Sequence, residues 1–197
     1  MKRQQLIQKI ETLGKGLFTI KDLKKLFPED AYIKTSVSRM LNRGDLVQVV
    51  RGVYALNINN LDVEKIAAQL YYPSYISFES ALAKYGILNQ GRFGLTLATT
   101  RHSKQMTIAG VECNYSKLKP ALFFGFDLID GVYLASPEKA VLDELYLICF
   151  GKRKVETSEW NLESLDRQKV QEYLKPFNSS VKKKASEMGL DRPIYLV

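Results

Sequence analysis

The stretch at residues 33–56, IKTSVSRMLNRGDLVQVVRGVYAL, constrains the fold of this chain more than any other part of the sequence. Its first half predicts a helix that ends at Gly44, because apolar residues recur at helical spacing at Ile33, Val37, Met40 and Leu41. Its second half holds two runs of β-branched and aromatic residues, LVQVV and VYAL, around Arg51-Gly52. Such runs on either side of a tight turn predict a β-hairpin with a basic tip.

Two further helical patterns precede this stretch. The first has apolar residues at Leu6, Ile7, Ile10 and Leu13. The second, FTIKDLKKLFP, has Thr19 as its expected N-cap and ends at Pro28, and Asp30 is the expected N-cap of the third helix. Three helices followed by a hairpin predict a winged helix-turn-helix domain over residues 1–58, in which the third helix enters the major groove of DNA.

The outer face of the third helix carries short hydroxyl donors and cations, and it has no acidic residue between Ala31 and Gly44. Base edges and phosphates require such groups. We therefore expect double-stranded DNA as the partner, with the major groove read by Lys34, Thr35, Ser36, Ser38 and Arg39. Arg43 and Arg51 are expected to contact phosphates. The alternative is a protein-interaction module, since three-helix units also dock other proteins.

The positive charge is concentrated in the same region. The chain has 197 residues and a net charge of +8, and residues 1–60 contribute 11 Lys and Arg against 5 Asp and Glu. This excess is typical of a nucleic-acid-binding surface, although a solvated basic surface gives the same count. In the remainder, the loop TTRHSK offers a second basic contact through Arg101 and Lys104, and the lysines at 182–184 indicate a solvated helix face.

A polar, turn-prone segment, Asn57–Asp62, predicts a linker to a second domain at residues 62–197. This part alternates helical and strand patterns, with a hairpin turn expected at Asp130-Gly131 and helices at the C-terminal end. Ser77 and Ser136 are expected to be helix N-caps. The predicted fold class is thus α+β: a winged helix-turn-helix followed by a mixed α/β domain with antiparallel hairpins and C-terminal helices.

Three segments together carry a family resemblance: RGVYAL, SYISFESALAKYGIL and LASPEKAVLDELY. Along essentially its whole length the chain resembles the AbiEi-type antitoxins of type IV toxin–antitoxin systems. The resemblance implies a transcriptional regulator that represses its own operon through inverted repeats. It also implies an antitoxin domain that counteracts a nucleotidyltransferase-like toxin. It implies no catalytic residues and no cofactor.

An enzyme is not expected, but a metal-dependent nuclease is the alternative to weigh. Its carboxylates would come from Glu79, Glu112, Asp127, Glu138 and Asp143. Such a site needs acids that converge on Mg²⁺, usually beside a lysine. In VECNYSK, Cys113 and Asn114 follow Glu112 and the lysine lies too far along, so the pattern does not fit.

The cysteine and histidine content and the lengths of the apolar runs argue against a zinc-binding, disulfide-bonded or membrane-spanning protein. The two cysteines, Cys113 and Cys149, lack metal-ligand spacing and share the chain with a single histidine, His102. We expect reduced thiols, no zinc and a cytoplasmic protein. No apolar run approaches the roughly 18–20 residues of a membrane span.

Overall fold

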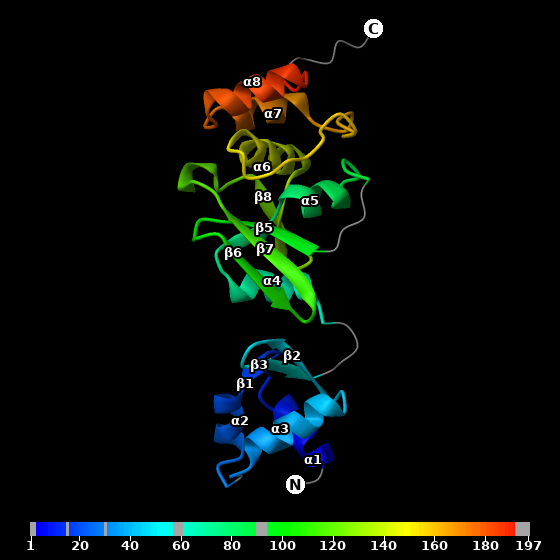
Figure 1. Cartoon of the computed structure of the whole chain (residues 1–197), viewed down its shortest axis with the longest axis vertical. Helices are drawn as coiled ribbons and strands as arrows, with labels where there is room; N and C mark the ends of the chain where they lie inside the picture. Colours follow the sequence, from blue (N-terminus) through cyan, green and yellow to red (C-terminus); the bar gives the residue numbers. More distant parts are fainter. Residues whose placement is uncertain (1–2, 15, 30, 57–60, 90–93, 192–197) are drawn as a thin grey trace. The chain divides into compact units, whose positions relative to one another are not determined.

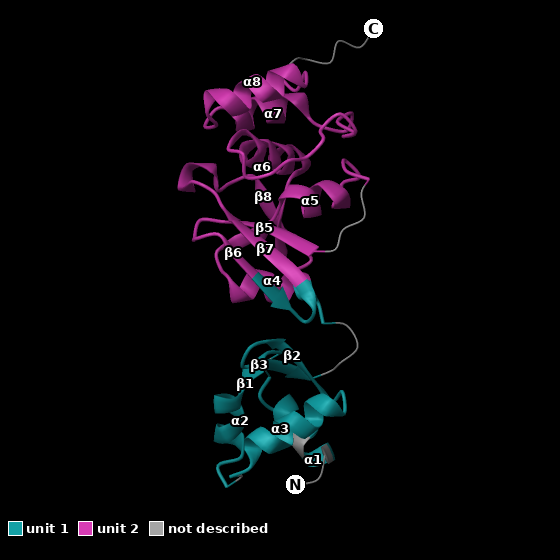
Figure 2. Cartoon of the chain, viewed as in Figure 1, with its two compact units in different colours: residues 1–63, 106–111 teal, residues 64–105, 112–197 magenta. Residues whose placement is uncertain are grey.

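The computed structural model describes residues 3–14, 16–29, 31–56, 61–89 and 94–191. It combines helices with two sheets, and both sheets contain antiparallel strand pairs, so the fold class is α+β, as predicted (Figure 1). The chain divides into two compact units, residues 1–63 with 106–111 and residues 64–105 with 112–197 (Figure 2). Of the predicted linker Asn57–Asp62, residues 57–60 lie outside the described residues.

The first unit combines three helices with a three-stranded antiparallel sheet of order β1-β3-β2. Its elements are α1 (Arg3–Glu11), β1 (Phe18–Thr19), α2 (Ile20–Leu26), α3 (Ile33–Asn42), β2 (Leu46–Val50) and β3 (Val53–Leu56). One apolar cluster holds them together, and it draws Ile10 from α1, Leu23 from α2, Tyr54 from β3, and Ile33, Val37 and Met40 from α3. The helix periodicity in the sequence predicted the three α3 residues of this core.

The ends of α2 and α3 follow from local side-chain chemistry. Thr19 caps α2 through a capping box, in which the Asp22 N–H donates to Thr19 Oγ1 at 3.3 Å and the Thr19 N–H donates to Asp22 Oδ2 at 2.9 Å. For α3, the N-cap residue is Tyr32, whose side chain makes no capping bond, and Asp30 lies outside the described residues. Gly44 ends α3 with φ of 75°, a conformation that glycine adopts without strain.

The larger sheet has six strands in the order β6-β7-β5-β4-β9-β8, and it belongs to the second unit except for residues 106–111 around the β6–β7 turn. The strands are β4 (Ser74–Ile76), β5 (Gly94–Thr99), β6 (Lys104–Ile108), β7 (Val111–Lys117), β8 (Phe126–Ile129) and β9 (Val132–Ala135). The predicted hairpin at Asp130-Gly131 is confirmed, because β8 and β9 pair antiparallel on either side of it. Two pairs are parallel, β5 with β7 and β4 with β9, and the sequence patterns did not predict them.

The helices of this unit are α4 (Val63–Leu70), α5 (Phe78–Lys84), a single 3₁₀ turn η1 (Pro120–Leu122), α6 (Pro137–Cys149), α7 (Arg167–Leu174) and α8 (Ser179–Glu187). The buried helix α6 contacts α5, α7 and α8 (Figure 1). Ser136 caps α6 as predicted, since its hydroxyl accepts the Lys139 N–H at 3.3 Å. Ser77 stands at the N-cap position of α5, as predicted, but its side chain makes no capping bond. Its hydroxyl donates to Asp143 Oδ2 at 2.8 Å instead.

That bond belongs to a buried ion pair at the centre of the second unit. Lys139 and Asp143, one turn apart on α6, form a salt bridge with both side chains inaccessible to solvent. Tyr75 on β4 donates to Asp143 Oδ2 at 2.8 Å and accepts from Lys139 Nζ at 3.0 Å. Burial raises the pKa of Asp143 and lowers that of Lys139, and the attraction between the two charges opposes both shifts.

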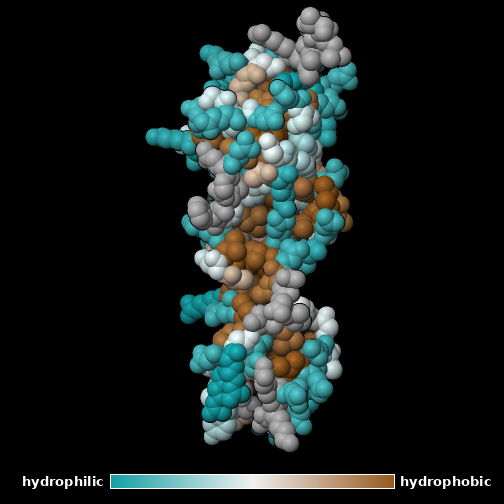
Figure 3. All heavy atoms as spheres, turned by 90° about the vertical axis from the view of Figure 1, so that its right-hand side faces the viewer, coloured by the Kyte–Doolittle hydropathy of each residue, from teal (hydrophilic) through white to brown (hydrophobic). Residues whose placement is uncertain are grey.

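On the face drawn in Figure 3, hydrophilic residues cover much of the surface and hydrophobic residues appear in patches between them. Among the described residues, no helix is both long enough and apolar enough to cross a bilayer.

Replacing Thr19 by alanine should lower the free energy of unfolding by about 1 kcal/mol, because the capping box of α2 is lost. Urea denaturation of the full chain measures the change. Thr12→Ala is the matched control, since the Thr12 hydroxyl bonds the Lys9 carbonyl at an exposed site and caps no helix N-terminus. Equal stability of the Thr19 variant and the control would contradict the capping role.

Replacing Lys139 by methionine should destabilise the second unit by roughly 3–5 kcal/mol, because it leaves the Asp143 carboxyl buried without its cation. The double variant Lys139→Met, Asp143→Leu should recover part of this loss, since neither charge then has to be desolvated. The matched control is the pair Glu64–Lys84, which is 2.9 Å apart but partly exposed. Glu64→Gln should cost less than about 1 kcal/mol in the same urea titration, and a comparable loss at both sites would contradict the prediction.

Candidate nucleic-acid interface

The first unit presents one polar and basic face of α3 to solvent. Four of the five residues predicted to read bases are exposed there: Lys34, Thr35, Ser38 and Arg39. They can face outward together because Ile33, Val37 and Met40 turn the opposite side of the helix into the core. Arg43, at the C-cap, is exposed as well.

Ser36 differs from the other predicted residues. It is half-buried and lines a groove of about 750 Å³ on the first unit, together with Thr35 and Arg39 of α3. The other lining residues come from α1 and from the end of α2 with the turn that follows it, namely Lys9, Leu26, Phe27, Pro28, Glu29 and Tyr32. The sequence pattern treated the outer face as uniformly exposed, whereas one side of it is a wall of this groove.

The groove brings in Lys9, which sequence reasoning did not place at the site, and Tyr32, which the helical pattern places on the outer face of the third helix without assigning it a contact. The Lys9 ammonium lies 4.9 Å from the centre of the Phe27 ring, so the cation stands at the groove wall. Tyr32 is 75% exposed just before α3. In the sequence, the signals for these two residues were a tyrosine just before the third helix and a lysine near the end of the first helix. Neither signal is specific for a binding groove.

The hairpin of β2 and β3 carries the remaining predicted residue, Arg51. Val50 and Val53 are register partners, so Arg51 and Gly52 form a two-residue turn. Gly52 has φ of 83°, which a tight hairpin turn requires and which glycine adopts at no steric cost. Arg51 is exposed, and Val49 and Tyr54 are buried, so the hairpin is anchored while its tip faces solvent.

This arrangement suits contact with a polyanion. An α-helix with its side chains is about 10–12 Å across and fits the B-DNA major groove, which is about 12 Å wide. Hydroxyls and guanidinium groups on such a helix bond base edges, and flanking cations bond phosphates. The first acid after α3, Asp45, is buried, so no carboxylate stands on the exposed face of the helix itself.

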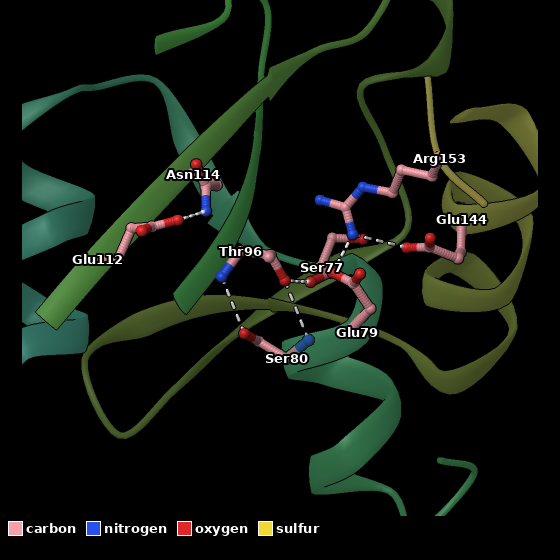
Figure 4. Close-up of polar contacts among 8 residues, drawn as sticks. All are labelled: Ser77, Glu79, Ser80, Thr96, Glu112, Asn114, Glu144 and Arg153. Atoms are coloured by element: carbon pink, nitrogen blue, oxygen red, sulfur yellow. Dashed lines mark hydrogen bonds and ion pairs between the residues drawn. The ribbon is translucent and has the colours of Figure 1, made fainter. Parts of the chain in front are cut away.

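In the second unit, the structure engages the carboxylates of the nuclease alternative in other bonds. Glu79 forms an ion pair with Arg153, and the same guanidinium bonds Glu144 at 3.2 Å (Figure 4). Glu112 accepts the Asn114 amide at 2.8 Å. Burial lowers the pKa of Arg153 to about 10, which leaves it charged at neutral pH as the partner of both acids.

Of the other three acids considered for a nuclease, two are bonded to neighbouring side chains and one lies exposed on a strand. Asp143 belongs to the buried pair, and Glu138 accepts the Ser136 hydroxyl at 2.9 Å and lies 3.3 Å from Lys169 Nζ. Asp127 is exposed on β8. Within the parts of the chain that the structure describes, no group of three or more His, Cys, Asp or Glu side chains is placed to hold a metal ion.

A second set of bonds in Figure 4 joins β5 to the start of α5. The Thr96 hydroxyl donates to the Ser77 carbonyl at 2.8 Å and accepts the Ser80 N–H at 3.0 Å, and the Thr96 N–H donates to Ser80 Oγ at 2.8 Å. These groups satisfy one another, as buried polar groups usually do. The set therefore stabilises the fold.

Neither Cys113 nor Cys149 forms a disulfide. Burial raises the pKa of the Cys113 thiol to about 11, which keeps it protonated at neutral pH.

Comparison with known proteins gives a similarity in fold to a solved structure. No family model matches the chain, and no curated protein matches its sequence. Among solved structures, the chain is similar to the RV2827C protein from Mycobacterium tuberculosis, with a TM-score of 0.61 over 95% of this chain and 75% of that chain. The two sequences are 12% identical, so the similarity establishes a shared fold and extends to no activity or partner.

Proposed function

We propose that the protein is a DNA-binding transcriptional regulator whose first unit is a winged helix-turn-helix domain. The observation that carries the proposal is the acid-free exposed face of α3, where Lys34, Thr35, Ser38 and Arg39 reach solvent together. In this proposal α3 lies in the major groove. Arg43 and Arg51 bind phosphates on either side, and the β2–β3 hairpin is the wing.

The regulatory role of the second unit rests on the family resemblance. As an AbiEi-type antitoxin, the chain would repress its own operon and counteract a nucleotidyltransferase-like toxin encoded beside it. The engaged carboxylates of the second unit favour a binding role over metal-dependent hydrolysis, since Mg²⁺ needs converging oxygen ligands.

One observation favours a second candidate, a protein-interaction module. The groove beside α3 has apolar walls at Leu26, Phe27 and Pro28, and the exposed Tyr32 stands at its edge. A docked peptide would contact these residues and would not depend on Arg51, which lies on the hairpin.

Replacing Arg39 by alanine should cost about 1–3 kcal/mol in binding to the operator and relax base preference at one position, because a bidentate contact to guanine is lost.

Replacing Arg51 by alanine should weaken binding to every sequence, because one phosphate contact is lost. The slope of log K against log salt concentration should become shallower by about one unit. Fluorescence anisotropy of the full chain with duplexes from upstream of its own gene measures both effects.

Arg39→Lys separates charge from geometry, since it retains the cation but loses the planar fork; it should keep the non-specific affinity and lose the base preference. Lys183→Ala, on the exposed face of α8, is the control for loss of one charge. Wild-type DNA binding by both the Arg39→Ala and Arg51→Ala variants would refute the DNA-binding proposal.

The antitoxin role predicts a neighbouring gene for a nucleotidyltransferase whose expression arrests growth. Co-expression of this chain should restore growth. The Arg39→Ala variant should restore growth equally well, because in this proposal the second unit counteracts the toxin. Continued arrest in the presence of the folded wild-type chain would contradict the antitoxin role and leave the DNA-binding proposal intact.

A further inference from the structure

The groove beside α3 in the first unit has the size of a small-molecule site. Its volume is about 750 Å³, and pockets that hold small molecules usually measure about 300–1,000 Å³. We call it the α3 groove. The described residues that line it are Lys9, Leu26, Phe27, Pro28, Glu29, Tyr32, Thr35, Ser36 and Arg39.

One side of the α3 groove is apolar, and the turn after α2 builds most of it. Leu26 is half-buried, Phe27 is buried at the C-cap position of α2, and Pro28 follows it. Tyr32, at the N-cap position of α3, adds a ring that is 75% exposed. Apolar walls beside an exposed ring can cover a flat aromatic group and remove it from water.

Two cations reach the α3 groove from different helices. The Lys9 ammonium of α1 lies 4.9 Å from the centre of the Phe27 ring, and this contact holds the cation at the wall. Arg39 is exposed on α3. Neither cation forms an ion pair with another described residue, and Glu29 is the single acid among the described lining residues. The lining therefore carries a net positive charge and favours an anion.

The helix sets the order of these groups along the groove. The two hydroxyl residues, Thr35 and Ser36, follow Tyr32 by three and four positions in the sequence, and Arg39 follows at the same spacing. Residues three and four apart are neighbours on one side of a helix. An aromatic ring, hydroxyl groups and a guanidinium group thus succeed one another along α3.

A structural role explains only part of this arrangement. Phe27 belongs to the apolar cluster of the first unit, and the Lys9 contact covers its ring. The core gives no reason for Tyr32 and Arg39 to stand exposed on the same side of α3. A specific protein interface engages about 20–30 residues on each side, and nine described residues line the groove. The groove by itself therefore suits a smaller ligand.

We propose that the α3 groove binds a small aromatic carboxylate. The ring lies against Tyr32 and Pro28, and the carboxylate accepts hydrogen bonds from the Arg39 guanidinium and the Lys9 ammonium. A guanidinium group presents two parallel donors that match the two oxygens of a carboxylate. The hydroxyl groups of α3 supply further donors beside it.

Such a ligand competes with DNA, a consequence that rests on the proposed function. Thr35, Ser36 and Arg39 are residues expected to read bases, and a carboxylate bound to Arg39 occupies the donors that a guanine would need. The ligand and the operator then weaken each other's binding by the same factor. The site is thus a regulatory one, through which a small molecule releases the regulator from its operator.

The first test is a titration of the full chain with 2-naphthoate in the absence of DNA, followed by amide NMR. The amide signals of Phe27, Tyr32, Thr35 and Arg39 should shift, with a Kd of about 1 mM or lower for a ligand of this size. Two control ligands separate the two parts of the proposal. The amide of the same acid keeps the ring without the charge, acetate keeps the charge without the ring, and both should bind more weakly.

Variants of the full chain locate the site. Lys9→Gln and Arg39→Gln should each weaken 2-naphthoate binding by about fivefold, the upper range for an exposed ion pair. Tyr32→Ala should also weaken it, because the exposed ring is lost. Lys24→Gln is the matched control, since it removes an exposed cation of α2 that does not line the groove, and its affinity should equal that of the wild type.

Three results would overturn the proposed site: no shift of these amide signals at about 10 mM 2-naphthoate, roughly ten times the expected Kd; equal affinity for either control ligand; or wild-type affinity in both the Lys9 and Arg39 variants.

The second test adds 2-naphthoate to the anisotropy assay with the operator duplex, with sodium acetate at the same concentration as the control for ionic strength. The ligand should weaken operator binding by the wild type, and less so by Lys9→Gln. Unchanged operator binding at saturating 2-naphthoate would overturn the competition. A chain that binds 2-naphthoate but no duplex would refute the DNA-binding proposal and leave the ligand site intact, so the two can fail separately.

Discussion

The second unit depends on a charge pair that water does not reach. Lys139 and Asp143 lie one turn apart on α6, and neither side chain is accessible to solvent. Removing two such charges from water costs several kcal/mol each, and the pair is tolerable only when its other polar partners are in place. Those partners are Tyr75 on β4 and Ser77 at the start of α5, so the position of α6 against the sheet is tied to both elements.

The aromatic surroundings of Lys139 strengthen this constraint. Its ammonium lies 5.2 Å from the centre of the Phe124 ring and 5.5 Å from that of Phe177. Phe124 precedes β8 and Phe177 lies between α7 and α8, so the cation also connects the C-terminal helices to the sheet. A lysine in the first turn of a helix would ordinarily be solvated, and here it is a central residue of the core.

Features whose signals are local were predictable. A few neighbouring residues determine the helix caps at Thr19 and Ser136, the end of α3 at Gly44 and the hairpin turn at Asp130-Gly131. The helical spacing within α3 likewise determines the burial of Ile33, Val37 and Met40. Features that depend on distant partners were not predictable. Ser77 bonds a carboxylate 66 residues away, and the half-burial of Ser36 depends on residues of α1 and of the turn after α2. Strand register likewise places Lys117 opposite Thr99, a pairing that the sequence pattern alone did not indicate.

The parallel pairing of β4 with β9 also governs the order in which the two units can be completed during synthesis. In the first unit, the sheet pairs Phe18 with Tyr54, so its strands are all available once the hairpin has emerged from the ribosome. The second sheet must wait, since Ile76 pairs with Leu134 and Asp143 follows later still. Contacts of long sequence separation form slowly. A nascent chain therefore carries a nearly complete α3 face while β4 is still an open edge and Tyr75 and Ser77 still lack their carboxylate partner.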